Sequence, residues 1–190
     1  MRAGREEAAV TSVRVWGPGA GAVVVLAATG VWAMGAQEVD PRLWGEVRPV
    51  IETRLVADAR GSGYGETVAG LRARWFCRAE ALELGREDDG VVRAGVNTLC
   101  MEYGVRGGAL VECGGARYPQ VLRLEREAHG GYRVVSREEP PDGAGYAEWT
   151  EDHFGFYAES GADGTMSSTA LETAARTHFG LPADARVAAC

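Results

Sequence analysis

One uninterrupted apolar run, residues 15–36, constrains this chain more than any other feature of its sequence. It reads VWGPGAGAVVVLAATGVWAMGA and contains no charged residue in 22 positions. A helix of about 20 apolar residues is long enough to cross the hydrocarbon core of a bilayer. The densest part, residues 22–34, also has the length of the apolar region of a signal peptide. The run therefore predicts an uncleaved transmembrane anchor or a cleaved signal peptide, with a buried cytosolic segment as the remaining alternative.

The charges around this run predict its orientation. The short segment 1–14 contains Arg2, Arg5 and Arg14, and positive charge on that side favours a cytoplasmic amino terminus. Small residues at 33–35 fit the site of a signal peptidase. Either leading interpretation exports the rest of the chain. We therefore expect a cell-membrane protein with its C-terminal domain outside the cytoplasm, or a secreted protein.

The charge balance of the exported part limits its partners. From residue 37 onward there are 25 acidic residues and 17 arginines, a net charge of −8. Nucleic-acid binding needs a basic stripe to meet the phosphates, so nucleic acid is excluded as a partner. The membrane, through residues 15–36 if they are not cleaved, and a protein of the cell envelope are the partners that we expect.

Four cysteines follow the apolar run: Cys77, Cys100, Cys113 and Cys190. Their spacing matches no zinc-binding pattern. Disulfides persist in the oxidising compartment to which export would deliver the domain. Cys77, Cys100 and Cys113 fall in neighbouring predicted strands, so we expect at least one disulfide among them. Cys190 either reaches a strand or stays free.

The exported segment 37–180 has an α+β pattern, followed by a tail, 181–190. Apolar residues at helical spacing predict a helix over 41–60, with Asp40 as N-cap and proline at the first helical position. Runs in which apolar and polar residues alternate, separated by tight turns, predict strands. Two further helices are expected after the strands, at 146–154 and 167–179. The strands are expected at 71–84, 96–106, 109–113, 121–127 and 132–137, with 114–119 as an interruption, 61–65 as a flexible turn and 159–165 as a loop. We therefore expect the first helix to cover the concave face of a curved antiparallel meander.

The end of the last hairpin resembles a known signature. Between residues 119 and 154 the sequence contains three segments in this order: PQVLRLE, HGGYRVVSREEPPDGAGY and HF. They resemble the carboxy-terminal signature of small exported proteins of Gram-positive, actinobacterial-type bacteria. The matching residues are Pro140, Asp142, Gly143, Tyr146 and Phe154. Many such proteins are similar to the cystatin-like or nuclear-transport-factor-like roll, and the resemblance implies that fold without a catalytic residue set. This chain departs from the signature at Gly155, where a proline is usual.

The same stretch also has a structural interpretation of its own. Tyr146 and Phe154 are two helical turns apart, so one helical face can pack both rings on the sheet. Its acidic residues then fall on the solvent side. We expect this corner to close the fold rather than to perform chemistry.

Aromatic residues predict what fills the space between the first helix and the sheet. Trp44 lies on that helix, and Trp75, Tyr103 and Tyr132 lie on predicted strands. Core packing is the simpler interpretation of these four residues. The alternative is that they line a pocket for a small apolar ligand.

The remaining polar residues do not form a catalytic pattern. Glu148, five residues before His153, is the one residue considered that could join it in binding a metal, and two ligands do not make a site. His129 is expected in a turn and His178 at a helix end. The sequence predicts no catalytic residue, metal or cofactor. We expect a non-enzymatic interaction domain; the alternatives are a roll that binds a small apolar ligand and, last, a hydrolase or isomerase using that pocket.

Overall fold

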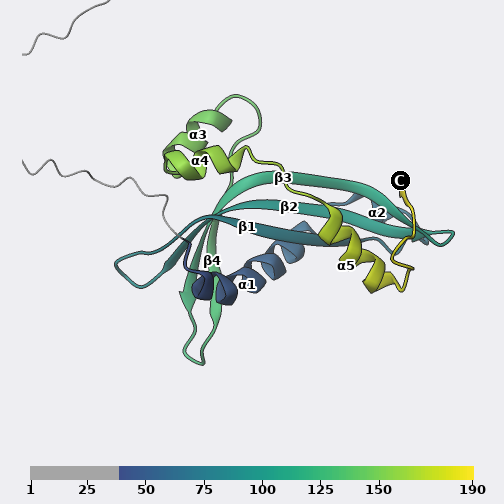
Figure 1. Ribbon diagram of the computed structural model, residues 1–190, viewed down its shortest axis with the longest axis horizontal. Coiled ribbons are helices and arrows are strands. Elements are labelled where there is room, and N and C mark those ends of the chain that lie inside the picture. Colours follow the sequence, from purple (N-terminus) through teal and green to yellow (C-terminus); the bar gives the residue numbers. More distant parts are fainter. Residues whose placement is uncertain (1–38) are drawn as a thin grey trace, which may run out of the picture. The chain divides into compact units, whose positions relative to one another are not determined.

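The computed structural model describes residues 39–190, except the side chains of Phe156, Tyr157 and Ser160 (Figure 1). The predicted segments 1–14 and 15–36 lie outside the described residues. Within 39–190, no helix combines the length and the apolar character needed to cross a membrane. The elements in chain order are α1 (Pro41–Ala59), α2 (Tyr64–Thr67), β1 (Arg74–Arg86), β2 (Val92–Arg106), β3 (Ala109–Arg126), β4 (Tyr132–Glu138), α3 (Tyr146–His153), α4 (Phe156–Ala162), α5 (Thr169–Phe179) and β5 (Val187–Ala189).

The strands form one open sheet. Strands β1 to β4 follow one another as an antiparallel meander, and β5 pairs with β3 in parallel. The predicted α+β class, with a helix packed on a mostly antiparallel sheet, is therefore confirmed. Strand β3 organises the sheet, since β2 pairs along one side of it while β4 and β5 share the other side.

Helix α1 covers one face of the sheet, as its sequence predicts. The carboxylate of Asp40 accepts hydrogen bonds from the backbone N–H groups of Arg42 and Leu43 (2.9 and 3.3 Å) and so caps the first turn. The helix continues through Pro49. Its buried side chains recur every four residues and pack against the aliphatic residues of all four long strands: Leu43, Val47, Ile51 and Leu55.

Helices α3, α4 and α5 cover the opposite face, so the sheet lies between two helical layers (Figure 1). Leu171 and Ala175 of α5 pack against Leu99 and Tyr103 of β2. At the other end of this face, Phe154 between α3 and α4 packs against Val121 of β3. Gly95 makes this contact close, because a Cβ added to it would lie 2.7 Å from the Phe154 ring.

Two arginines from the sheet fasten the short helices to this face. Arg93 of β2 donates a hydrogen bond to the carbonyl of His153, the last residue of α3. Arg117 of β3 donates to the carbonyl of Ala162, the last residue of α4 (3.0 Å), and to that of Gly164 (2.8 Å). The last carbonyls of a helix have no partner within the helix and favour a nearby cation. The sheet therefore supplies the C-terminal caps of both helices.

The glycine-rich segment 61–65 is a turn at Gly61, as expected, but its last two residues, Tyr64 and Gly65, begin the short helix α2. The buried carboxylate of Glu102 in β2 accepts hydrogen bonds from the N–H groups of Gly65 (2.9 Å) and Glu66 (2.7 Å) at the start of α2. A Cβ on Gly63 would lie 2.3 Å from an oxygen of Glu102. Only glycine fits against this carboxylate, and Glu102 is too far along the chain for a local pattern to reveal the contact.

Three further expectations are corrected. Strand β3 runs without a break through residues 114–119, because each of these residues keeps a partner in β2. The first hairpin begins later and continues closer to its turn than expected, since β1 runs from Arg74 to Arg86 and pairs with a β2 that begins at Val92. The expected loop 159–165 is helical as far as Ala162.

Candidate functional site

A cleft of about 470 Å³ opens where β4 ends and the chain turns toward α3. One wall belongs to β3 and the other to the turn and the start of α3. Its lining residues are Ala116, Arg117 and Tyr118 from β3, and Glu139, Pro140, Pro141, Asp142, Gly143 and Tyr146 from the corner. Four of the five signature residues, Pro140, Asp142, Gly143 and Tyr146, therefore line one cleft, while the fifth, Phe154, is buried beneath α3 and α4.

The local sequence explains the shape of the corner. Pro140 and Pro141 have fixed φ angles and no N–H, so they end the β4 ladder and hold the residues before them extended. Gly143 (φ 73°) and Gly145 (φ 103°) then adopt left-handed conformations that favour glycine. The chain reverses, and Tyr146 becomes the first residue of α3 at the cleft.

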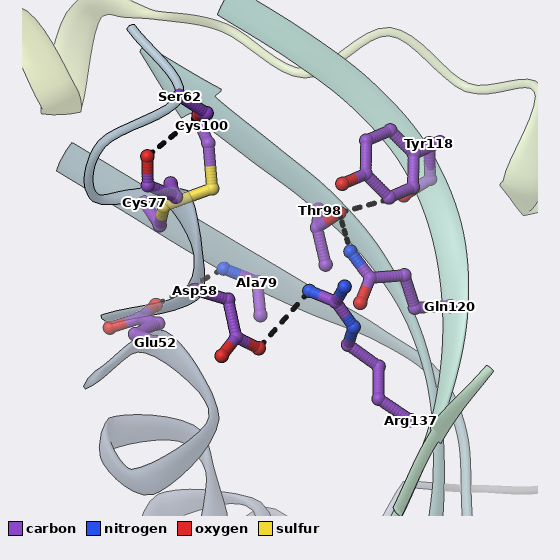
Figure 2. Close-up of a disulfide and its surroundings, with 11 residues drawn as sticks. Glu52, Asp58, Ser62, Cys77, Ala79, Thr98, Cys100, Tyr118, Gln120 and Arg137 are labelled. Atoms are coloured by element: carbon purple, nitrogen blue, oxygen red, sulfur yellow. Dashed lines mark hydrogen bonds and ion pairs between the residues drawn. A yellow bond between two sulfur atoms is a disulfide. The ribbon is translucent and has the colours of Figure 1, made fainter. Parts of the chain in front are cut away.

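The β3 wall of the cleft is exposed at Ala116 and Arg117, and hydrogen bonds to β2 hold it at Tyr118 and Gln120. Ala116 and Arg117 are exposed, whereas Gln120 is buried. The hydroxyl of Thr98 in β2 donates to the carbonyl of Tyr118 (2.8 Å), and the amide of Gln120 donates to the same hydroxyl (3.0 Å; Figure 2). This chain of hydrogen bonds fixes the backbone from which the Tyr118 ring projects.

The rim of the cleft is acidic. Glu139 and Asp142 are exposed there. Arg137 pairs with Asp58 of α1 (3.2 Å; Figure 2). It also pairs with Glu139 (3.2 Å), so the rim is joined to the first helix. Burial raises the pKa of Tyr118, and the carboxylate of Glu139 raises it further. Its phenol therefore stays protonated at neutral pH and can donate a hydrogen bond.

The second phenol in the cleft behaves in the same way. Burial raises the pKa of Tyr146, and Asp163 adds to this effect. The two tyrosines thus present aromatic surface and neutral hydroxyl groups, next to the acidic rim. Aromatic side chains with a polar tip are common in binding surfaces.

His153 belongs to a separate polar cluster that holds α3 on the sheet. Its Nδ1 lies 2.7 Å from the carbonyl oxygen of Trp149, and its ring stacks on the indole at 4.2 Å. Its Nε2 lies 3.4 Å from a carboxylate oxygen of Glu138 in β4. A hydrogen bond from Arg123 is the main reason that the pKa of Glu138 is lowered. Glu138, distant in sequence, is therefore the acidic neighbour of His153, whereas the sequence suggested Glu148.

Among residues 39–190, no three His, Cys, Asp or Glu side chains are grouped so that they could hold a metal ion. His129 is exposed in the turn between β3 and β4. His178 lies near the end of α5, where its ring meets Phe76 and Phe179 edge-on. His129 and His178 therefore lie where the sequence predicts them, in a turn and near a helix end.

Two disulfides stabilise the domain. Cys77–Cys100 joins facing residues of β1 and β2 (Figure 2). Cys113–Cys190 fastens the end of the chain to β3. The prediction of at least one disulfide is confirmed, and both bonds fit an oxidising compartment. The tail predicted at 181–190 contains β5. Of the two alternatives for Cys190, a bond to a strand or a free thiol, the structure has the bond to Cys113 of β3.

The four aromatic residues considered for a pocket do not gather in one cavity. Tyr132 is buried in the core beneath α1, and Trp44, on α1 itself, is half-buried against the same core. Trp75 is half-buried opposite Glu102, toward α2. Tyr103 lies on the other face, against Leu110 and α5. Fully buried side chains, including Val47 and Ile51, fill the space between α1 and the sheet.

Sequence reasoning did not find the β3 wall of the cleft. Ala116, Arg117 and Tyr118 fall in the segment expected to interrupt the sheet. The only local signal is Pro119, since a proline in a strand is typical of a sheet edge. No protein-family model matches the chain, and neither the curated proteins nor the solved structures contain a match.

Proposed function

We propose that this protein is an exported, disulfide-stabilised binding domain that engages a protein of the cell envelope through the corner cleft. The apolar run 15–36 would anchor it in the membrane or direct its secretion. We also propose that the domain belongs to the cystatin-like or nuclear-transport-factor-like roll class. The observation that carries the proposal is the cleft itself, which brings Tyr118, Tyr146 and the acidic rim together at an exposed sheet edge.

The chemistry of the cleft supports recognition. Two phenols and two prolines offer rigid surface that loses little conformational entropy on binding, and Glu139 and Asp142 offer charge at the rim. Arg137 already pairs with Glu139, and the sheet fixes Tyr118. A cleft held in this way needs little reorganisation to bind a partner.

The small apolar ligand of the alternative interpretation has no comparable support. The side chains of α1 fill the space where that ligand would sit. An enzyme that uses the same space meets the same obstacle. We therefore keep the protein-binding proposal as the only one.

Site-directed photocrosslinking in intact cells tests the proposal. A photoreactive amino acid replaces Ala116 in the cleft or, as the matched control, the exposed Ala128 in the turn between β3 and β4. We expect the full chain to form one defined protein adduct from position 116 and none from position 128. Identical adduct patterns from the two positions, or no adduct from position 116, would contradict the proposal.

Export has its own test. We expect externally added protease to digest the domain on intact cells or spheroplasts, or the domain to be found in the culture medium. We expect all four cysteines to resist alkylation until they are reduced. A cytosolic product with four free thiols would contradict the exported location.

A further inference from the structure

The outer side of β3 is open along the cleft. Strand β4 pairs with β3 at residues 121–126, and β5 pairs with it at residues 110–112. Eight residues, 113–120, lie between these two pairings. Cys113 lies at a bulge in the β2–β3 register, and residues 114–120 have β2 as their only strand partner among residues 39–190. Gly115, Ala116 and Arg117 are exposed in the middle of this segment. We call residues 113–120 the open edge.

The open edge has backbone groups ready for another strand. Pro119 has no N–H, and proline is tolerated where the missing donor would point away from the neighbouring strand. Alternate residues of a strand direct their backbone groups to the same side. Gly115 and Arg117 therefore direct N–H and C=O groups outward, and Pro119 directs its C=O outward.

The chain already uses this side of β3 to accept a strand. In the β5 pairing, the N–H of Leu110 donates to the carbonyl of Arg186 (3.1 Å), and the N–H of Cys190 donates to the carbonyl of Glu112 (2.9 Å). The Cys113–Cys190 disulfide ends this pairing at the first residue of the open edge. An added strand would continue an interface that β5 begins.

We propose that an extended, basic segment of a partner polypeptide adds to the sheet along the open edge, between β4 and β5. This inference rests on the proposed function and names the class of partner. Eight residues of strand span roughly 26 Å at about 3.3 Å per residue. The partner's backbone pairs with Gly115, Arg117 and Pro119, while its side chains enter the corner cleft.

Charge selects a basic partner. Glu139 and Asp142 stand at the rim of the cleft, where Arg137 already pairs with Glu139, so Asp142 is the carboxylate that a cationic segment would meet. The one basic residue of the lining, Arg117, has its guanidinium held by the carbonyls of Ala162 and Gly164. The sequence beyond residue 36 has a net charge of −8, which attracts a cationic segment over a longer range.

Peptide selection tests this inference with a defined probe. A displayed library of random ten-residue peptides is selected on the full chain in mild detergent, with both disulfides formed. Selected peptides are then measured on Ala116→Trp, which fills the cleft, and on Ala128→Trp as its matched control. A second pair of variants, Asp142→Arg and the control Asp152→Arg, changes the charge at exposed positions. This pair still tests the inference if Ala116→Trp fails to fold.

We expect selected peptides to alternate apolar and polar residues and to carry lysine or arginine. Ala116→Trp or Asp142→Arg should weaken their binding at least tenfold, and the control variants should not. Methylation of alternate backbone nitrogens of the peptide should also weaken binding at least tenfold. Amide hydrogen exchange at Gly115 and Arg117 should slow when the peptide binds, because these N–H groups become paired.

Other outcomes overturn the inference. Peptides that tolerate backbone methylation, or that leave exchange at Gly115 and Arg117 unchanged, would exclude strand addition. Strand addition would also be excluded if no selected peptide bound Ala116→Trp or Asp142→Arg more weakly than the control variants. Self-association of the full chain that Ala116→Trp abolishes would make a second copy the occupant. In each of these cases a crosslink from position 116 to a different protein of the envelope would leave the proposed function standing, and its absence would remove both.

Discussion

The two faces of the sheet are covered in different ways. On one face, the 19-residue helix α1 buries one aliphatic stripe in which no side chain is more than 7% exposed. On the other face, three helices of 8, 7 and 11 residues divide the surface. The first two of these helices depend on Arg93 and Arg117 for their C-terminal caps.

The difference follows from helix length. A long amphipathic helix presents a continuous apolar stripe and needs polar partners only at its two ends. Short helices have proportionally more unpaired carbonyls, so more of their attachment to the sheet is polar. The α1 face therefore behaves as a permanent core. The face under α3 and α4 combines a small core with ionic contacts, and it leads into the corner cleft.

The largest loss is expected in the α1 core. Ile51→Ala removes three methyl or methylene carbons from a fully buried side chain and should lower the free energy of unfolding by about 4 kcal/mol. Urea denaturation of the full chain with intact disulfides measures this. Ala57→Ser, on the exposed side of the same helix, should change the free energy by less than about 0.5 kcal/mol. A loss below about 1 kcal/mol for Ile51→Ala would break the distinction between the faces.

A somewhat smaller loss is expected at the centre of the opposite face. Phe154→Ala removes the ring that packs on Gly95 and Val121, and it should cost about 3 kcal/mol because short helices can partly close the cavity. Tyr146→Ala should cost less, since Tyr146 is only half-buried at the cleft. The same denaturation measurement compares the two variants. Equal losses would indicate that Tyr146 is as much a core residue as Phe154.

The polar attachment of α3 should contribute less again. Arg93→Met keeps the aliphatic stem, removes the donor to the carbonyl of His153 and leaves the carboxylate of Glu83 without its partner. We expect a loss of about 2 kcal/mol. Replacing both Arg93 and Glu83 with methionine should recover part of the lost free energy of unfolding, because no unpaired carboxylate remains. If the double variant is less stable than Arg93→Met by more than about 1 kcal/mol, the ion pair is not the source of the loss.

The smallest effect should depend on pH. Glu138 has a lowered pKa, mainly because Arg123 donates a hydrogen bond to it. Its ionised form therefore stabilises the folded state above the ordinary value of 4.5, and this contribution is lost as the pH falls through the lower folded value. Glu138→Gln should cost less than about 1 kcal/mol at pH 7, since the side chain is partly solvated.

The pH series that checks this runs from neutral to acidic. The stability difference between the wild type and Glu138→Gln should shrink below the ordinary carboxyl pKa. Asp152→Ala, at an exposed position of α3, should show no difference at any pH. A Glu138→Gln difference that grows toward low pH would contradict the role of Arg123.

Local patterns predicted much of the fold but little of the candidate site. The spacing of Leu43, Val47, Ile51 and Leu55 predicts the buried face of α1 because a helix repeats every 3.6 residues. Alternation also groups Leu99, Met101 and Tyr103 on one side of β2. It does not say which side faces α1, and Tyr103 proved to lie on the other one. The corner residues of the cleft carried a recognisable pattern, whereas its β3 wall carried only Pro119.

The sequence by itself determined that a long apolar run precedes an acidic α+β domain, which hairpins it contains and where its first helix lies. Each of these features depends on neighbouring residues. Only the tertiary structure decided that Glu102 caps α2, that Cys190 pairs with Cys113, and that β3 continues past β4 to leave an open edge beside the cleft. These contacts join segments far apart in the chain, so their existence depends on strand register and helix placement, which no local period specifies.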